Sequence, residues 1–150
     1  MKILIINTYD VQGGAARAAY RLHQSLLDAG IDSRMLVQSK VSDDPKVIGP
    51  QTKFQKIIAK LRPLMDNRPV RFYRQREGTI FTPAWFPWSG LGKRIRQIDP
   101  DIVHLHWVAG GMLCIEELAS IDYPIVWSLH DMWLFTGGCH YDNNCDKYKK

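Results

Sequence analysis

The sequence contains no apolar run long enough to cross a bilayer and has only 3 cysteines. Its first apolar run, Ile3 to Ile6, is short, is followed at once by Asn7, and lacks a small-residue cleavage site, so it is not a signal peptide. An odd number of cysteines at irregular spacing does not form a disulfide framework and suits a reducing compartment. We therefore expect a cytoplasmic protein without a membrane-spanning segment.

Three common motifs are also absent. Residues 13–17 (Gly-Gly-Ala-Ala-Arg) lack the G-x-G-x-x-G spacing of a dinucleotide-binding loop, and the second predicted strand ends in Gln38 and Ser39 rather than in an acidic residue for a ribose. The same segment lacks the Gly-Lys-Ser/Thr of a Walker A loop, and the chain contains no G-x-S-x-G nucleophile elbow. The sequence therefore carries none of the usual signatures of NAD-binding, ATP-binding or serine-hydrolase domains.

What the chain does have is the size and composition of one folded domain. It has 150 residues, of which 45% are hydrophobic, so it can bury a real core, and it is short for two domains. Its 20 Lys and Arg outnumber 15 Asp and Glu, which gives a formal net charge of +5. The position of these charges matters more than their sum, because much of the excess lies in residues 51–76.

The opening of the chain has the pattern of a strand, a glycine-bearing loop and a helix. Ile3 to Ile6 is apolar without alternation, as in a strand buried on both faces. A helix is predicted after Gly13-Gly14, ending at Gly30, and a second strand over Asp32 to Ser39. Together these elements predict a right-handed βαβ unit.

The second half repeats this alternation, which predicts an α/β fold, a Rossmann-like doubly wound parallel sheet. The loops at Gln12 to Gly14, His106-Trp107 and His130-Asp131 would then lie on one rim of the sheet, where ligands bind in such folds. The other predicted elements are short strands over 79–82, 101–106 and 124–129, helices over 93–97 and 112–119, and an aromatic loop over 83–88.

Gly13 and Gly14 have two interpretations. As a binding loop, they would let a phosphate or a sugar approach the backbone, with free N–H groups at the start of the helix and the charge of Arg17 nearby. As a structural turn, they would only let the helix pack close to the strand, and Arg17 would be a solvated side chain. The residues alone leave both interpretations open.

His104 and His106 point to the same face of the strand predicted over 101–106. Their spacing could serve a metal, but no third ligand at a diagnostic spacing accompanies them. His104 lies deeper in the strand and is predicted to be a satisfied core histidine. His106, at the strand exit, is the better candidate for a ligand contact.

His130 and Asp131 directly follow the strand predicted over 124–129. A histidine there can donate or accept a proton near neutral pH, and a neighbouring carboxylate or hydroxyl could orient it. The alternative is that Asp131 caps the following turn while His130 is an ordinary surface residue. A further group, Cys139, His140 and Cys145, is spaced more widely than a zinc knuckle, so it indicates a metal site only weakly, and we assign no metal ligands.

Residues 51–76 carry eight Lys or Arg against one Asp, and apolar residues recur among them at helical spacing. Pro63 is expected to bend or end this helix. Such a charge run is usually only a solvated face, but an amphipathic basic helix also suits an anionic membrane surface, whereas no motif supports binding to nucleic acid. The candidate membrane residues are Lys53, Lys56, Lys60 and Arg62.

Taken together, several segments resemble the retaining GT-B glycosyltransferases grouped as family 4, especially bacterial enzymes of exopolysaccharide and colanic acid assembly. The resemblance runs from end to end of the chain and is firmest in the first thirty and last fifty residues. The segments that carry it are 2–7 (Lys-Ile-Leu-Ile-Ile-Asn), 13–19 (Gly-Gly-Ala-Ala-Arg-Ala-Ala), 101–107 (Asp-Ile-Val-His-Leu-His-Trp), 127–133 (Trp-Ser-Leu-His-Asp-Met-Trp) and 135–141 (Phe-Thr-Gly-Gly-Cys-His-Tyr).

The resemblance implies the N-terminal, acceptor-side half of an enzyme that moves a sugar from a nucleotide diphosphate sugar to a hydroxyl, with retention and without a cofactor or an essential metal. By this analogy Gly13, Gly14 and Arg17 would approach the donor phosphates. His130 would be the catalytic histidine, which contacts the donor sugar without acting as a nucleophile. The acceptor side of the cleft would be lined by His106, Trp107, Asp131 and Trp133.

The resemblance also implies a C-terminal donor-binding domain that these residues do not include, so we expect this polypeptide to be inactive alone. In such relatives a further Cys-x-x-Cys-Pro would join Cys139 and Cys145 in a four-cysteine cluster. The expected partners are a nucleotide sugar, a glycan or lipid-linked acceptor, and the inner face of the plasma membrane. Two alternatives stay open: a non-catalytic binding or regulatory module of the same fold, and a GT-B-like sugar-nucleotide epimerase.

Overall fold

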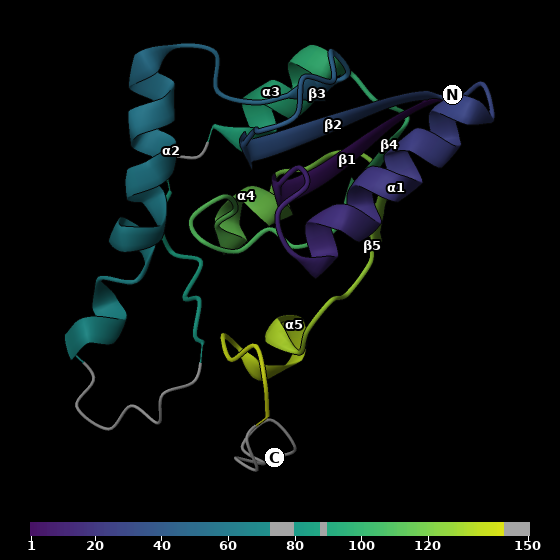
Figure 1. Cartoon of the computed structure of the whole chain (residues 1–150). Coiled ribbons are helices and arrows are strands. Elements are labelled where there is room, and N and C mark those ends of the chain that lie inside the picture. Colours follow the sequence, from purple (N-terminus) through teal and green to yellow (C-terminus); the bar gives the residue numbers. More distant parts are fainter. Residues whose placement is uncertain (73–79, 88–89, 143–150) are drawn as a thin grey trace.

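A five-stranded parallel sheet with helices on both faces forms the body of the protein (Figure 1). The computed structural model describes residues 1–72, 80–87 and 90–142. The strand order is β3-β2-β1-β4-β5. The strands are β1 (Lys2–Tyr9), β2 (Asp32–Ser39), β3 (Val47–Ile48), β4 (Ile102–Leu105) and β5 (Ile125–Trp127). The helices are α1 (Gly14–Asp28), α2 (Lys53–Asp66), the 3-10 turn η1 (Pro69–Phe72), α3 (Leu91–Ile98), α4 (Ile115–Ala119) and α5 (Trp133–Thr136).

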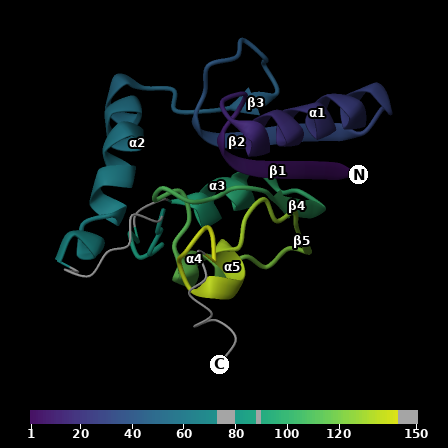
Figure 2. The ribbon, with the colours of Figure 1, turned by 60° about the horizontal axis from the view of Figure 1, so that its bottom comes forward.

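β1 runs through the centre of the sheet, and its side chains alternate between two buried clusters. Ile3 and Ile5 face the side that α1 covers, whereas Leu4 and Ile6 face the side that α3 and α4 cover (Figure 2). Burial on both faces explains why this strand is apolar without alternation. The register places Ile5 beside His104 of β4, so the carboxyl ends of β1 and β4 lie together.

The predicted fold class is confirmed, and β2 has the predicted bounds. β1 is longer than predicted because it continues through Asn7 to Tyr9, whose polar residues still pair with β2. The helix predicted over 112–119 begins only at Ile115, because the preceding residues 112–114 are buried in the core as irregular chain. The two-residue strand β3 was not predicted, since it is too short to show a period.

The strand predicted over 79–82 is wrong for its described part. Within the described residues, Phe81 forms only an isolated antiparallel bridge with Cys139. Thr79 lies outside the described residues, as does Trp88 of the predicted aromatic loop. The bridge nevertheless matters, because it holds the chain after α5 against residues 80–82.

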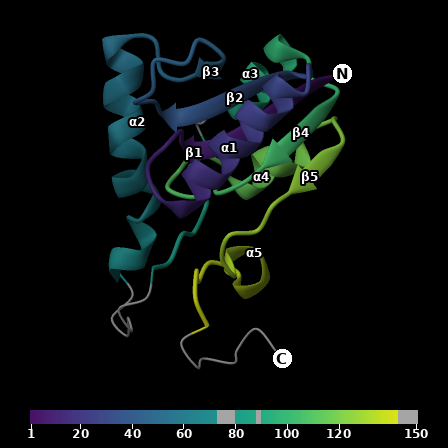
Figure 3. The same ribbon diagram turned by 45° about the vertical axis from the view of Figure 1, so that its right-hand side comes forward.

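α2 stands beside the sheet, toward the carboxyl ends of the strands (Figures 1 and 3). A capping box starts it: the hydroxyl of Thr52 accepts the N–H of Gln55 at 3.1 Å, and the Gln55 amide oxygen accepts the N–H of Thr52 at 3.3 Å. Pro63 does not end the helix, which continues to Asp66. The buried Asp66 carboxylate accepts the N–H of Trp85 at 3.3 Å, so the turn after Pro63 is held by tertiary contacts.

Within the described residues, no helix is both long enough and apolar enough to pass through a bilayer.

Candidate active site

The carboxyl ends of β1 and β4 are tied to one another by hydrogen bonds. The amide oxygen of Asn7 accepts the N–H of Trp107 at 2.8 Å, and the N–H of Thr8 donates to the Trp107 carbonyl at 2.8 Å. The rings of Tyr9 and Trp107 stack with their centroids 6.1 Å apart. Because β5 lies next to β4 in the same parallel sheet, the loops after β1, β4 and β5 leave the same edge, as predicted.

The glycine loop joins β1 to α1 at this edge. Gly13 is the N-cap residue of α1, with φ 91 and ψ 172, a backbone conformation that other residues rarely adopt. A Cβ added to Gly13 or Gly14 would meet no atom within 4 Å, so neither glycine is needed for close packing of the helix on the strand. No side chain caps α1, and the Arg17 side chain is exposed, with its Nε donating back to the Gly13 carbonyl at 3.3 Å.

Asp10 holds this loop, although sequence reasoning missed it. Its buried carboxylate accepts backbone N–H groups from Val11 at 2.9 Å, Val41 at 2.8 Å and Ser42 at 2.7 Å. Burial acts to raise the pKa of this carboxyl, but the hydrogen bonds outweigh it and the pKa is lowered. Asp10 therefore stays ionised and fixes the loop after β1 to the chain after β2. The feature of the sequence that could have identified Asp10 is its position as an acidic residue directly after a buried strand.

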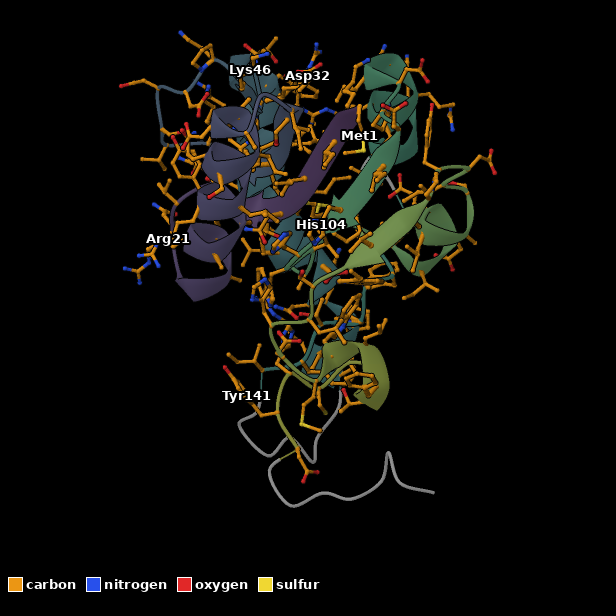
Figure 4. All side chains as sticks on the ribbon, turned by 90° about the vertical axis from the view of Figure 1, so that its right-hand side faces the viewer. Met1, Arg21, Asp32, Lys46, His104 and Tyr141 are labelled. Carbon is orange, nitrogen blue, oxygen red and sulfur yellow. The ribbon has the colours of Figure 1, made fainter. Side chains whose placement is uncertain are left out.

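Three histidines form a row from the middle of the sheet to its edge. His104 lies on β4 in the centre of the molecule (Figure 4), and its Nε2 is 2.8 Å from the Ser128 hydroxyl. This agrees with the prediction that its side chain is hydrogen-bonded, but His104 is half-buried rather than part of the core. The ring centroids of His104 and His106 are 4.5 Å apart, and those of His106 and His130 are 5.2 Å apart in a stacked arrangement.

His106 is the buried middle member of this row, and His130 is its exposed end. Nδ1 of His106 lies 2.9 Å from Nε2 of His130, and Nε2 of His106 has no hydrogen-bond partner. Burial, together with the charges of His104 and His130, lowers the pKa of His106 to about 4. His106 is thus a neutral imidazole behind His130, and a ligand at the edge would meet His130 first.

Asp131 is engaged in structural hydrogen bonds. Its Oδ1 accepts the backbone N–H of Trp133 at 3.0 Å, which is the turn-capping role considered as the alternative from the sequence. Its Oδ2 accepts the indole N–H of Trp107 at 2.8 Å and also bonds Nδ1 of His140. The second ring nitrogen of His140 lies 2.8 Å from the Thr82 hydroxyl.

This network, from Trp107 through Asp131 and His140 to Thr82, fixes the chain that follows β5. Trp133 adds to it, because its buried ring donates the indole N–H to the Thr82 carbonyl at 2.9 Å. Trp133 therefore belongs to the core, with only an edge near the surface. His140 and Thr82 were missed by sequence reasoning as members of the site.

A small depression brings several predicted residues together. A separate hollow of about 230 Å³ lies between α3 and the segment before β5, and it contains none of the candidate residues. The small depression lies at the carboxyl ends of the strands, where ligands bind in folds of this kind. It is lined by His106, Trp107, Val108, Ala109, Trp127, Leu129, His130, Asp131, Trp133 and Leu134.

Within residues 1–72, 80–87 and 90–142, no three His, Cys, Asp or Glu side chains converge in a way that could hold a metal ion. Cys139 is a free, partly exposed thiol, and Cys145 lies outside the described residues. The expectation that the protein needs no metal or cofactor therefore stays a prediction.

The candidate membrane residues of α2 separate into two groups. Lys53, Lys56 and Lys60 are exposed, whereas Arg62 is half-buried, faces the protein near Glu117 of α4, and has its pKa lowered by burial. Arg62 was grouped with the lysines by charge alone. Helical spacing puts its side chain on another side of α2, so it does not belong to the exposed basic surface.

The strand order and the histidine-bearing edge define a Rossmann-like α/β domain with a candidate ligand site beside its central strand. The family model of Glycosyltransferase Family 4 matches residues 12–148, and the chain belongs to that family. Its fold is that of the N-terminal half of a GT-B glycosyltransferase.

One curated relative gives the comparison more detail. WcaC of Escherichia coli (strain K12), provisionally named a colanic acid biosynthesis glycosyl transferase, is 24% identical over 159 residues. The match covers 99% of this chain but 38% of WcaC, so the chain spans well under half the length of that relative. No solved structure matches the chain.

Proposed function

We propose that this domain acts in the transfer of a sugar from a nucleotide diphosphate sugar to a hydroxyl acceptor, with retention, in bacterial surface polysaccharide synthesis. Membership of Glycosyltransferase Family 4 supports the reaction class. The observation that carries the proposal is the position of His130, exposed at the carboxyl edge of the sheet and supported from behind by His106.

The glycine loop would form the donor side of the site. The first N–H groups of α1 have no side-chain cap, and the space over Gly13 and Gly14 is open. A helix start of this kind favours an anion, and the charge of Arg17 adds to it. We infer that the diphosphate of the donor approaches this loop from a second domain opposite.

His130 would contact the donor sugar as a hydrogen-bond donor and stabilise charge near the reacting carbon, without forming a bond to it. Of the residues predicted for the acceptor side, Trp107 offers a partly exposed ring at the edge of the depression. Asp131 and Trp133 would act through the residues they hold, because their polar atoms already bond other parts of the protein. His106 would act through His130, because it is buried behind that residue and its Nδ1 lies against the His130 ring. The acceptor would be a glycan or a lipid-linked hydroxyl.

The test uses the whole gene product with a panel of UDP-sugars and GDP-sugars and a mixture of candidate acceptors. We expect one donor to be consumed, with the anomeric configuration retained in the product by NMR. His130→Ala should lower kcat/KM by about 100-fold to 1000-fold, the usual loss when one donor to a developing charge is removed. His130→Gln should recover part of this loss, since an amide can still donate.

Arg21→Gln is the control, because Arg21 projects from α1 into solvent (Figure 4). It should leave kcat/KM unchanged. If no nucleotide sugar is bound or hydrolysed and His130→Ala changes nothing, the protein is a non-catalytic module and the proposal fails. Release of an altered sugar without any acceptor would instead identify an epimerase.

A further inference from the structure

The apolar side of α2 is turned away from the protein. Phe54 is 70% exposed, Ile57 57%, Leu61 45% and Leu64 54%. Their spacing of three, four and three residues places them in one row along the helix. A surface helix normally buries such a row against the core, so this arrangement is the reverse of the usual one.

The opposite side of α2 holds it to the protein. Asp66 is buried there, and burial raises its pKa although backbone N–H groups, including that of Trp85, bond to its carboxyl. Gly111, which follows the rim loop of β4, packs against the backbone of Arg62: an added Cβ would lie 3.0 Å from the Arg62 carbonyl oxygen. The outward apolar row is therefore fixed in place by contacts that do not involve it.

A row of lysines runs beside the apolar row. Lys53, Lys56 and Lys60 each directly precede an apolar member, and all three are exposed. The only acidic residue of 53–72 is Asp66, whose side chain is buried. Over this whole stretch, the exposed charges are therefore all positive.

We propose that α2 lies in the interfacial layer of an anionic lipid membrane, with its apolar row among the acyl chains and its lysines at the phosphate headgroups. Lysine can extend its charged end to the headgroups while its stem covers apolar surface. Lysine is depleted in protein interfaces, which argues against a protein partner. A second copy would bring one lysine row against another with no acidic side chain between them.

This docking would place the candidate active site at the membrane surface. α2 contacts the chain directly after the rim loop of β4, and both Figure 1 and Figure 3 show it on the side of the sheet where the strands end. A lipid-linked acceptor would then reach His130 without leaving the membrane. The docking itself does not depend on sugar transfer, and it is measured without any activity assay.

The experiment is co-sedimentation of the 150-residue chain with vesicles of phosphatidylcholine alone and with vesicles of equal parts phosphatidylcholine and phosphatidylglycerol. We expect binding to the anionic vesicles only, and its loss at about 1 M salt, where screening shortens the reach of charges to about 3 Å. Replacing Lys53, Lys56 and Lys60 with Gln should weaken partitioning by about 100-fold. Phe54→Ser with Ile57→Ser should weaken it by about tenfold or more.

Two control variants remove the same kinds of side chain, exposed charges and exposed apolar groups, from surfaces outside α2. Arg21→Gln, Lys93→Gln and Arg96→Gln delete three exposed charges on α1 and α3, and Val41→Ser with Ile115→Ser deletes two exposed apolar side chains. Both control variants should bind the anionic vesicles within about twofold of the parent chain. Absent binding, equal binding to both vesicle types, equal losses in the controls, or self-association through α2 would each overturn the proposal.

Discussion

Nδ1 of His106 lies 2.9 Å from Nε2 of His130, and this contact decides which proton His130 carries. One of the two nitrogens must donate. If His130 donated, His106 would carry its proton on Nε2, a buried atom without a partner. An unpaired buried N–H is rarer and costlier than an unpaired acceptor, so His106 donates from Nδ1. His130 is then protonated on Nδ1, and that N–H is available at the exposed edge.

The first prediction concerns this tautomer. In the 150-residue chain above pH 7, long-range ¹H–¹⁵N NMR should show Nε2 of His130 without a proton and Nδ1 with one. His106→Phe removes the donor, so His130 should shift toward the Nε2–H form that imidazoles prefer in water. Detection of a proton on Nε2 of His130 in the parent chain would contradict the assignment. The readout is independent of sugar transfer, so it separates positioning from catalysis.

The second prediction concerns stability in mild acid. Burial and the charges of His104 and His130 lower the pKa of His106 to about 4 from 6.5, so the folded state resists its protonation. The unfolded chain binds that proton as pH falls through 6.5, and the folded chain only near 4. The stabilisation is therefore complete above pH 6.5 and is lost as pH falls toward 4. His106 alone should account for about 2 kcal/mol of lost unfolding free energy between pH 7 and pH 5.

Urea unfolding at pH 7 and pH 5 measures this loss. His106→Asn should flatten the pH dependence, whatever its effect at pH 7. Burial also lowers the pKa of His23 and of His104, so the variant should retain a residual dependence of the same sign. An unchanged slope in His106→Asn would show that His106 is protonated in the folded state at pH 5.

The third prediction separates the structural role of Asp131 from a role in acceptor binding. Asp131 accepts from His140, and both side chains are almost wholly buried. A double-mutant cycle of Asp131→Ala and His140→Ala should therefore give a coupling free energy of about 1–3 kcal/mol in urea unfolding. Tyr20→Phe, which removes a hydroxyl on α1 far from this network, should combine with Asp131→Ala additively. If the losses of unfolding free energy in Asp131→Ala and His140→Ala simply add, the two side chains are not coupled. Asp131 would then be available to bind a ligand.

The sheet could be predicted because its signals are local. Continuous apolar runs such as Ile3 to Ile6 indicate strands buried on both faces, and their alternation with helices fixes a parallel order. The candidate edge followed from the same rule, which places the residues after β1, β4 and β5 together. His130 was found this way, since it directly follows an apolar strand.

The rest of the site depends on contacts that no local pattern encodes. His140 meets Thr82 across 58 residues of sequence, through a loop and an isolated bridge.

The sequence could not predict which side of α2 faces away from the protein, for another reason. Periodicity shows that one side of the helix is apolar, but only Asp66 and the approach of Gly111 to Arg62 decide which side faces the protein.

The last prediction compares the two glycines of the loop. Gly14 is the first residue of α1, and an added Cβ would meet nothing within 4 Å. Gly14→Ala should therefore leave the unfolding free energy of the chain unchanged or raise it by up to about 1 kcal/mol. If the donor diphosphate approaches the backbone here, the same methyl group should lower kcat/KM of the whole gene product for the donor by about tenfold or more.

Gly13→Ala is the comparison variant, because it should destabilise the folded chain through backbone strain rather than block a ligand. Its φ of 91 lies in a region that alanine adopts only with strain, so this variant should lose about 1–3 kcal/mol of unfolding free energy. A loss of activity in Gly13→Ala alone would fit a purely structural turn. A stable Gly14→Ala protein with weakened donor use identifies a binding loop, whereas a stable and fully active one shows that the open space over Gly14 receives no phosphate.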